Sequence, residues 1–469
     1  MDKDLVEYAI KYAQEKGVDF VEARMLSRFG SGFVLNNGNL EVSGFDESSG
    51  IGIKIIVKNN EGFLSLNNPS KDKVKEMIDR KIISLKNSSK LSEPSLLSEE
   101  STKVKEYIAP EKIKIKDLSP EKKLKIILDI DKAVKDTGLS MKRYFSLGDS
   151  YEKKYLVNSD GSKIYSEIPL NSFFWFLTVF KNGQSVQKYG SEKYTKGYEM
   201  YNEIDLGLEI TETAKILNKI LTKSISSPKE PVDVVIAPEV VGIMVHESAG
   251  HPYEADRIFG REAAQAGESF VTEDMTGTQI GSECCTVVDD PTIKGSAGFY
   301  LYDDEGIKAR EKILMSKGVI TEFLHDRSTA KAMGLKSNGS ARANDYNRES
   351  LVRMSNTYLK PGDYKEEELF EDIKKGVYLK SFMEWNIDDK RYNQKYTGCE
   401  AYLIEKGELK GVVKDPAIEI TTPKLWKSFD AVADNVKMYA GNCGKGEPAQ
   451  GIPVLMGGPS ARLRGIRLC

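Results

Sequence analysis

The six-residue motif from His246 to His251 (HESAGH) constrains the local fold more tightly than any other feature of the chain. It gathers two of only three histidines around a glutamate. Neutral imidazole nitrogens bind borderline cations such as Zn2+, and a neighbouring carboxylate can accept a proton from a water molecule that the metal polarises. The motif therefore predicts a metal site with His246 and His251 as ligands and Glu247 as the catalytic base. A core histidine without metal at position 246 is the weaker alternative.

The spacing of the two histidines excludes a regular α-helix between them if both bind one ion. At 100° per residue, five residues separate the two side chains by roughly 140°. Gly250 is suited to a left-handed helix end, and Pro252 disfavours helical backbone at the residue before it. We therefore expect a buried strand over Val232–Ile236 and then a helix over Glu239–Ala249. This helix should break at its end, so that His251 folds back from just beyond it.

A third metal ligand must come from elsewhere in the chain, because a catalytic zinc site usually has three protein ligands. The strongest candidate is Cys443 in the segment 440–446 (AGNCGKG), where glycines permit close backbone approach and Lys445 favours the thiolate. On residue type alone, a buried structural cysteine in a tight turn is an equal alternative. Other residues with suitable ligand atoms are His325, Glu254 and Asp256. We expect these two carboxylates to pair locally and this histidine to line the cleft.

Further motifs follow in the second half of the chain. They are Tyr302–Gly306 (YDDEG), His325–Ala330 (HDRSTA), Arg353–Thr357 (RMSNT), Gly376–Leu379 (GVYL) and the loop Gly441–Gly446. With the histidine motif they cover the chain after about Val232, which resembles the TldD/PmbA metalloproteases and specifically the TldD branch, with its intact HExxxH motif. In the first half the resemblance is one of organisation, with the turn Asn158–Gly161 as a weak marker.

The resemblance implies the chemistry, the substrate and the assembly. It implies that His246, His251 and Cys443 bind Zn2+ and that Glu247 is the catalytic base. It also implies cleavage of short or unfolded peptides lying extended in a groove. A dimer would enclose the site in a chamber, formed with a paralogous subunit that lacks HExxxH or with a second copy of this chain. The segment Met383–Asp389 (MEWNIDD) departs from the glycine-rich pattern often found there, so substrate preference is expected to differ.

Chain length predicts two domains, because 469 residues exceed the size at which a single core stops growing. We expect the boundary at the polar segment 224–231, which contains two prolines. We expect residues 1–227 to form an N-terminal mixed α/β domain and residues 232–469 to form a strand-rich, barrel-like domain that carries the metal-binding helix. The fold class is therefore α+β.

Local patterns predict the individual elements. Helices are expected over Asp2–Lys16, Ser70–Lys86 and Pro120–Lys135, strands around Phe20–Ser27, Gly32–Leu35, Leu40–Ser43, Ile51–Val57 and Phe173–Phe180, and hairpins over Ile313–Leu324 and Ala401–Val413. The charged stretch Lys103–Lys116 reads as a loosely ordered surface. Cys284 and Cys285 have the pattern of strand residues.

Composition argues against several classes of partner. The 68 basic and 71 acidic residues give a formal charge of −3, which provides no global field for binding nucleic acid directly. The longest apolar run is far shorter than the ~20 residues that a membrane-spanning helix needs. The N-terminus lacks the features of a signal peptide, and five scattered cysteines fit reduced thiols, so we expect a cytoplasmic protein.

The sequence offers more than one candidate for the oxyanion partner and for the function. The tetrahedral intermediate of peptide hydrolysis needs a partner for its oxyanion. The sequence does not choose among the candidates Tyr253, His325, Arg342 and Arg353. The alternative function is a non-enzymatic adaptor or modulator, associated with a gyrase or a toxin system, whose structural zinc has four protein ligands. Glu247 favours the enzyme, because a structural site has no need of a base beside its ligand.

Overall fold

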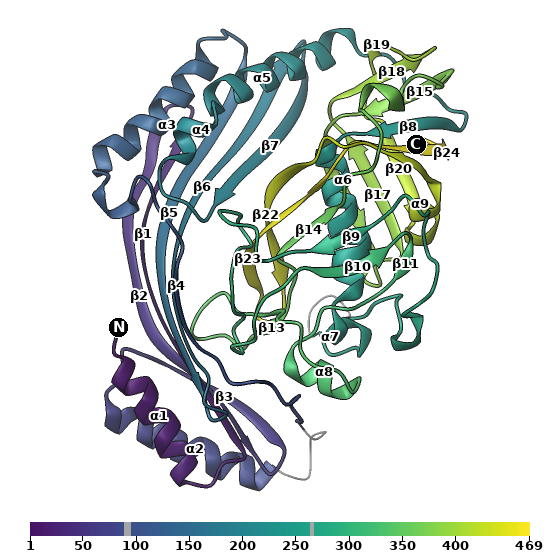
Figure 1. Cartoon of the computed structure of the whole chain (residues 1–469). Helices are drawn as coiled ribbons and strands as arrows, with labels where there is room; N and C mark the ends of the chain where they lie inside the picture. The colour runs from purple at the N-terminus through teal and green to yellow at the C-terminus, as the bar shows by residue number, and fades with distance from the viewer. Residues whose placement is uncertain (89–94, 263–266) are drawn as a thin grey trace.

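The first half of the chain forms one long, strongly curved sheet. The computed structural model describes residues 1–88, 95–262 and 267–469 (Figure 1). The strand order is β3-β2-β1-β5-β6-β4, and β7 also pairs with β6. The strands are β1 (Phe20–Asn36), β2 (Asn39–Val57), β3 (Asn60–Asn67), β4 (Val104–Ile108), β5 (Met141–Asn158), β6 (Lys163–Lys181) and β7 (Gln184–Tyr194).

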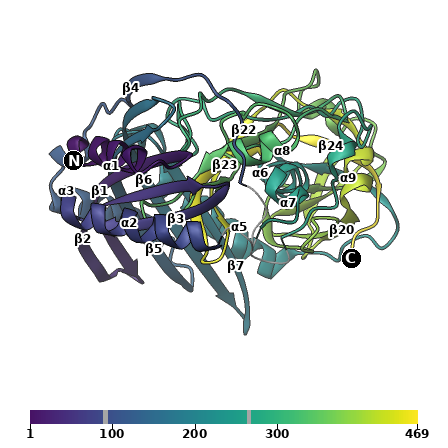
Figure 2. The same ribbon diagram turned by 90° about the horizontal axis from the view of Figure 1, so that it is seen from below.

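Helices cover the outside of this curve, and the second half of the chain lies inside it (Figures 1 and 2). Near one end of the sheet are α1 (Lys3–Glu15) and α2 (Lys71–Ser88), and near the other are α3 (Pro120–Lys135), α4 (Met200–Glu203) and α5 (Leu206–Lys223). Successive side chains of β1 point to opposite faces of the sheet, so one set faces the helices and the other faces the second half of the chain. Val21 and Ala23 pack into the core beneath α1, whereas Arg24 and Arg28 donate hydrogen bonds to backbone carbonyls of the second half.

The second half is built mainly from short strands. Two six-stranded sheets have the orders β19-β18-β15-β8-β24-β21 and β11-β10-β9-β14-β23-β22, and smaller sheets are β16-β17-β20 and β12-β13. The strands are β8 (Val232–Ile236), β9 (Val287–Asp289), β10 (Lys312–Ser316), β11 (Val319–Ile320), β12 (Ala341–Arg342), β13 (Leu351–Val352), β14 (Asn356–Leu359), β15 (Lys375–Leu379), β16 (Phe382–Ile387), β17 (Asn393–Gly398), β18 (Ala401–Glu405), β19 (Glu408–Val412), β20 (Ala417–Thr421), β21 (Phe429–Val432), β22 (Lys437–Lys445), β23 (Gln450–Gly458) and β24 (Ala461–Ile466). Its helices are α6 (Pro238–Val245), α7 (Ala255–Ile258), α8 (Arg327–Ala332) and α9 (Thr422–Ser428).

Helix α6 lies in the core of the second half, where it packs against β14, β22 and β23. It begins with Pro238 at its first turn, a position where the missing N–H costs nothing. Gly242 lets the helix approach β23 closely, because a Cβ atom there would lie 3.0 Å from backbone atoms of Met456 and Gly457. The histidine motif continues directly from this buried helix, so it too is held inside the protein.

Ion pairs with buried carboxylates connect the curved sheet to the second half of the chain, and the YDDEG motif supplies these carboxylates. Lys154 lies 2.7 Å and Arg24 3.9 Å from Asp304, and Lys54 lies 3.3 Å from Glu305. Burial raises the pKa of Asp304, whereas Lys154 and Arg24 lower it, and the result is about 2. This carboxylate is therefore strongly held in its charged form at the junction.

The α+β fold class is confirmed, and so are the helices near the N-terminus and the two predicted hairpins. Other local predictions were wrong. Residues 104–108 are not loose surface but form β4, which pairs in parallel with β6. The two strands expected between residues 20 and 35 are the single strand β1. Cys284 and Cys285 are not strand residues: Cys284 lies in a turn before β9, and Cys285 follows this turn. Among the described residues, no helix is long and apolar enough to cross a membrane.

Candidate metal centre

The histidine motif forms a single π-helical turn at the end of α6. Residues His246–Gly250 make the turn, and the backbone N–H of His251 donates to the carbonyl of His246. This bond spans five residues instead of four, so the two histidines return to the same side of the helix. The predicted helix break was wrong, because Gly250 and His251 both have right-handed helical backbone with φ of −58° and −61°.

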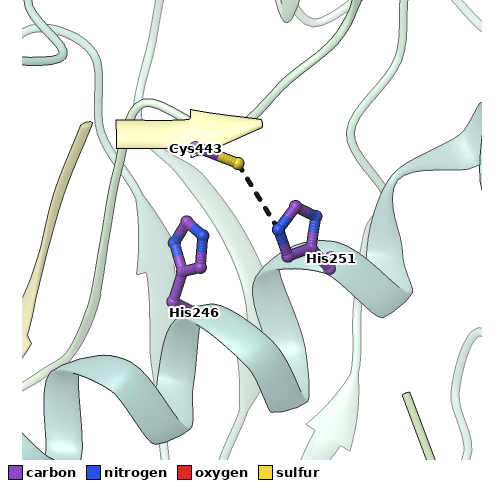
Figure 3. Close-up of side chains that lie close together, drawn as sticks. All are labelled: His246, His251 and Cys443. Carbon is purple, nitrogen blue, oxygen red and sulfur yellow. Dashed lines mark hydrogen bonds between the residues drawn. The ribbon is translucent and has the colours of Figure 1, made fainter. Parts of the chain in front are cut away.

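Three candidate ligands meet at this turn (Figure 3). The imidazole rings of His246 and His251 have centroids 4.8 Å apart. Cys443 reaches them from β22, and its Sγ lies 3.4 Å from Nε2 of His251. The ligand atoms of the three residues all lie within 4.8 Å of one another. The structure thus brings the three sequence-predicted ligands together.

The chemistry of this donor set fits a zinc ion. All three side chains are buried, and Nδ1 of His246 has no hydrogen-bond partner among the residues described. Burial raises the pKa of the Cys443 thiol, but electrostatic interactions with His251 and Arg353 lower it, and the net pKa is well below its usual value. A thiolate and two imidazoles are ordinary zinc ligands.

Glu254 orients His251 instead of competing with it as a ligand. Its Oε2 lies 2.9 Å from Nδ1 of His251 and also accepts from Arg257 at 3.0 Å. A carboxylate on the second ring nitrogen fixes the tautomer and orientation of a ligating histidine. The expected local pairing is seen for Glu254, whose partners His251 and Arg257 are each three residues away, and Asp256 accepts locally from the backbone N–H of Arg257. Both carboxylates also pair with the distant Lys445, at 3.2 and 2.6 Å, which the sequence did not indicate. The ammonium group of Lys445 is thus directed at two carboxylates, and the groups that lower the pKa of the Cys443 thiol include His251, Arg353 and His246.

Glu247 is held by two residues that sequence reasoning missed. The indole Nε1 of Trp385 donates to Oε1 of Glu247 at 3.1 Å, and Nη1 of Arg391 lies 3.6 Å from Oε2. This second oxygen is buried and accepts no hydrogen bond within the described part of the chain. The only signal in the sequence was that Trp385 lies in the segment that departs from the glycine-rich pattern.

A cavity of about 1300 Å³ lies between the curved sheet and the second half of the chain, and the site opens into it. Its walls include residues of β6, β7 and α5 on one side and of α6, β16 and β22 on the other. His246, Glu247, His251 and Cys443 all line it, as does Arg391. A substrate in this cavity would therefore meet the metal ligands and the glutamate together.

The four candidates for stabilising an oxyanion do not line this cavity. Arg353 donates to the backbone carbonyls of Cys443 and Gln450, and Arg342 donates to two other carbonyls, so both are structural. Tyr253 packs against Phe323. The expectation that His325 lines the cleft was also wrong: its Nδ1 is paired with Thr329, and burial lowers its pKa to about 4.

Comparison with known proteins accounts for almost the whole chain. Residues 229–468 match the model of the PmbA/TldA metallopeptidase C-terminal domain, and residues 113–218 and 21–84 match the central domain and domain 1 of the same family. A metalloprotease of Methanocaldococcus jannaschii is 32% identical over 95% of this chain and 96% of its own length. A zinc metalloprotease TldD homolog of Saccharolobus solfataricus is 27% identical over 98% of both chains.

Solved structures share the fold at low sequence identity. TldE from Thermococcus kodakarensis is 18% identical with a TM-score of 0.77, covering 99% of this chain and 100% of that one. A Thermotoga maritima protein, described as a candidate modulator of a DNA gyrase, is 16% identical with a TM-score of 0.80 and full coverage of both chains. From the matching family models and the 32% identical relative, the chain belongs to the PmbA/TldD family of metallopeptidases.

Proposed function

We propose that this protein is a zinc-dependent peptidase of the TldD branch that hydrolyses short or unfolded peptides, with Glu247 as general base. One observation carries the proposal: a cluster of three zinc-type donor atoms and a buried glutamate face the same cavity. Three protein ligands are usual for a catalytic zinc site, whereas a structural site is closed by four. Among the described residues, the cluster contains three such ligands.

In this mechanism His246, His251 and Cys443 would hold the zinc ion. When bound, zinc acts as a Lewis acid that makes water a nucleophile at neutral pH and polarises a peptide carbonyl. Glu247 accepts the proton of the attacking water on Oε2, the oxygen without a hydrogen-bond partner, and later delivers it to the leaving amine. Trp385 holds the other oxygen, so the carboxylate keeps one orientation during both transfers.

The cavity supports a peptide as substrate. Its volume of about 1300 Å³ exceeds the roughly 300–1,000 Å³ of pockets for small molecules. An unfolded chain can enter such a space, whereas a folded domain must first expose a segment. The proposed active form is a dimer with a paralogous subunit that lacks the HExxxH motif, or with a second copy, which would restrict access further.

The test compares wild type with Glu247→Gln on a mixed library of short unstructured peptides, with and without a paralogous partner. Cleavage is read by mass spectrometry and zinc by elemental analysis. We expect cleavage to fall by about 10²- to 10⁴-fold in the variant while zinc is retained. Glu405→Gln, at an exposed position at the end of β18, serves as control. Absence of cleavage by wild type in every combination, with zinc held by four protein ligands, would instead support the adaptor.

A further inference from the structure

A row of aromatic rings lines the cavity from the curved sheet to the candidate base. Phe174 of β6 stacks on Tyr189 of β7 with centroids 6.2 Å apart. The rings of Tyr189 and Phe382 are T-shaped with centroids 6.4 Å apart, and those of Phe382 and Trp385 are T-shaped with centroids 5.6 Å apart. All four residues line the cavity, and the row ends in the hydrogen bond from Trp385 to Glu247. The row therefore joins the sheet wall to the reacting centre.

The row presents apolar ring surface to the cavity. Trp385 is 36% exposed and Tyr189 is half-buried, so part of each ring faces the cavity. Lys188 lies 5.3 Å from the centroid of Phe382, but its ammonium group is paired with Glu239. A cationic substrate side chain at this position would be repelled by the ammonium group of Lys188. An anionic side chain would gain little from Lys188, because Glu239 already neutralises its charge. A large uncharged side chain fits the wall best.

We propose that Tyr189, Phe382 and Trp385 form a subsite for a large apolar side chain next to the scissile bond, and that Trp385 also positions Glu247. This inference rests on the proposed peptidase function and names its preferred substrates. Contact with the subsite should favour phenylalanine or leucine over alanine by at least about tenfold, because apolar pockets discriminate side-chain size by roughly 10–200-fold. Trp385 is a positioning residue, because its N–H acts through Glu247.

The two roles of Trp385 reside in different parts of its side chain. The ring supplies the wall of the subsite, and the indole N–H orients the carboxylate of Glu247. Trp385→Phe keeps an aromatic ring but removes the donor. Replacing Tyr189 changes the wall without touching the hydrogen bond to Glu247. The two substitutions therefore separate side-chain preference from the turnover step.

The subsite is tested with octapeptides that differ at one residue beside the cut: Phe, Leu, Ala, Asp or Lys. For wild type we expect kcat/KM to be at least about tenfold higher with Phe or Leu than with the other three. Tyr189→Ala should reduce this ratio to about threefold or less, whereas Tyr364→Ala, an exposed aromatic outside the cavity lining, should preserve it. Equal rates for all five peptides, or a preference for Asp or Lys, would overturn the subsite.

The same peptides are also measured by calorimetry in a Glu247→Gln background, where binding is read without hydrolysis. The affinity ranking should match the ranking of rates and should flatten with Tyr189→Ala. This ranking decides the subsite even if wild type cleaves nothing, an outcome that would refute the proposed function and with it the positioning role.

Positioning by Trp385 is tested with Trp385→Phe in the otherwise intact protein. We expect kcat to fall about tenfold for every peptide, with KM, peptide ranking and zinc content maintained. A kcat equal to that of wild type would overturn this role. A rise in KM with kcat maintained would also do so, since it would show that the N–H contributes only to binding.

Discussion

Gly250→Ala tests whether the π-turn is held by packing. Gly250 has helical φ, so alanine brings no backbone strain and should by itself stabilise the turn by about 0.4–1 kcal/mol. However, a Cβ atom there would lie 1.9 Å from Sδ of Met354, a core residue that is 1% exposed. Ordinary contacts are about 3.5–4.0 Å, so Met354 would have to move by more than about 1.5 Å. Such overpacking costs about 1–3 kcal/mol, and the middle of the two ranges leaves a net loss of about 1–2 kcal/mol.

We expect the thermal midpoint of Gly250→Ala to fall by roughly 2–8 °C, at about 2–4 °C per kcal/mol. Zinc content should fall with it, because the displaced turn carries His251. Gly207→Ala is the matched control: it also adds a methyl group to a helical glycine, but its Cβ meets other atoms no closer than 3.4 Å. If Gly250→Ala is as stable as wild type while Gly207→Ala behaves as expected, the packing argument is wrong.

Two further predictions concern the metal site and the junction between the halves. Cys443→Ser should lower bound zinc after dialysis by about tenfold or more, because a neutral hydroxyl replaces a thiolate; full metal content in elemental analysis would exclude Cys443 as the third ligand. For Asp304, the folded-state pKa of about 2 lies below the ordinary 3.8, so its contribution is present above pH 4 and is lost as pH falls toward 2. That contribution is about 2 kcal/mol, and urea unfolding from pH 5 to 2 should show a correspondingly smaller pH dependence in Asp304→Asn.

The spacing of apolar residues correctly predicted the helices and hairpins in which that spacing is regular. The amphipathic helices α2 and α3 and the hairpins β10–β11 and β18–β19 belong to this group. Strand β4 was not predicted because most of its side chains are exposed. Its sequence is therefore typical of a surface loop, although its backbone pairs with β6. The sequence did not predict that β1 is one continuous strand, because polar and glycine residues interrupt its apolar pattern.

For the candidate site, the sequence predicted which residues have suitable ligand atoms but not the geometry that brings them together. The two histidines and Glu247 are close in sequence, and glycines pointed to Cys443, although the metal-binding roles remain predictions. The π-turn was not predictable, because one shifted hydrogen bond depends on contacts such as that between Gly250 and Met354. The hydrogen bond from Trp385 to Glu247 was also not predictable. Trp385 lies 138 residues further along the chain, and only the position of β16 in the fold brings it to Glu247.

The residues of the candidate metal centre are far apart in the chain, which sets when during biosynthesis the site can be completed. Cys443 follows His251 by 192 residues. At about 5–20 residues per second, a ribosome takes roughly 10–40 s to pass from one to the other. Strand β24, which lies directly beside β8 at the root of helix α6, is made later still. A nascent chain thus carries Glu247 and both histidines for many seconds before Cys443 is made, so the proposed three-ligand site can be completed only when synthesis is nearly finished.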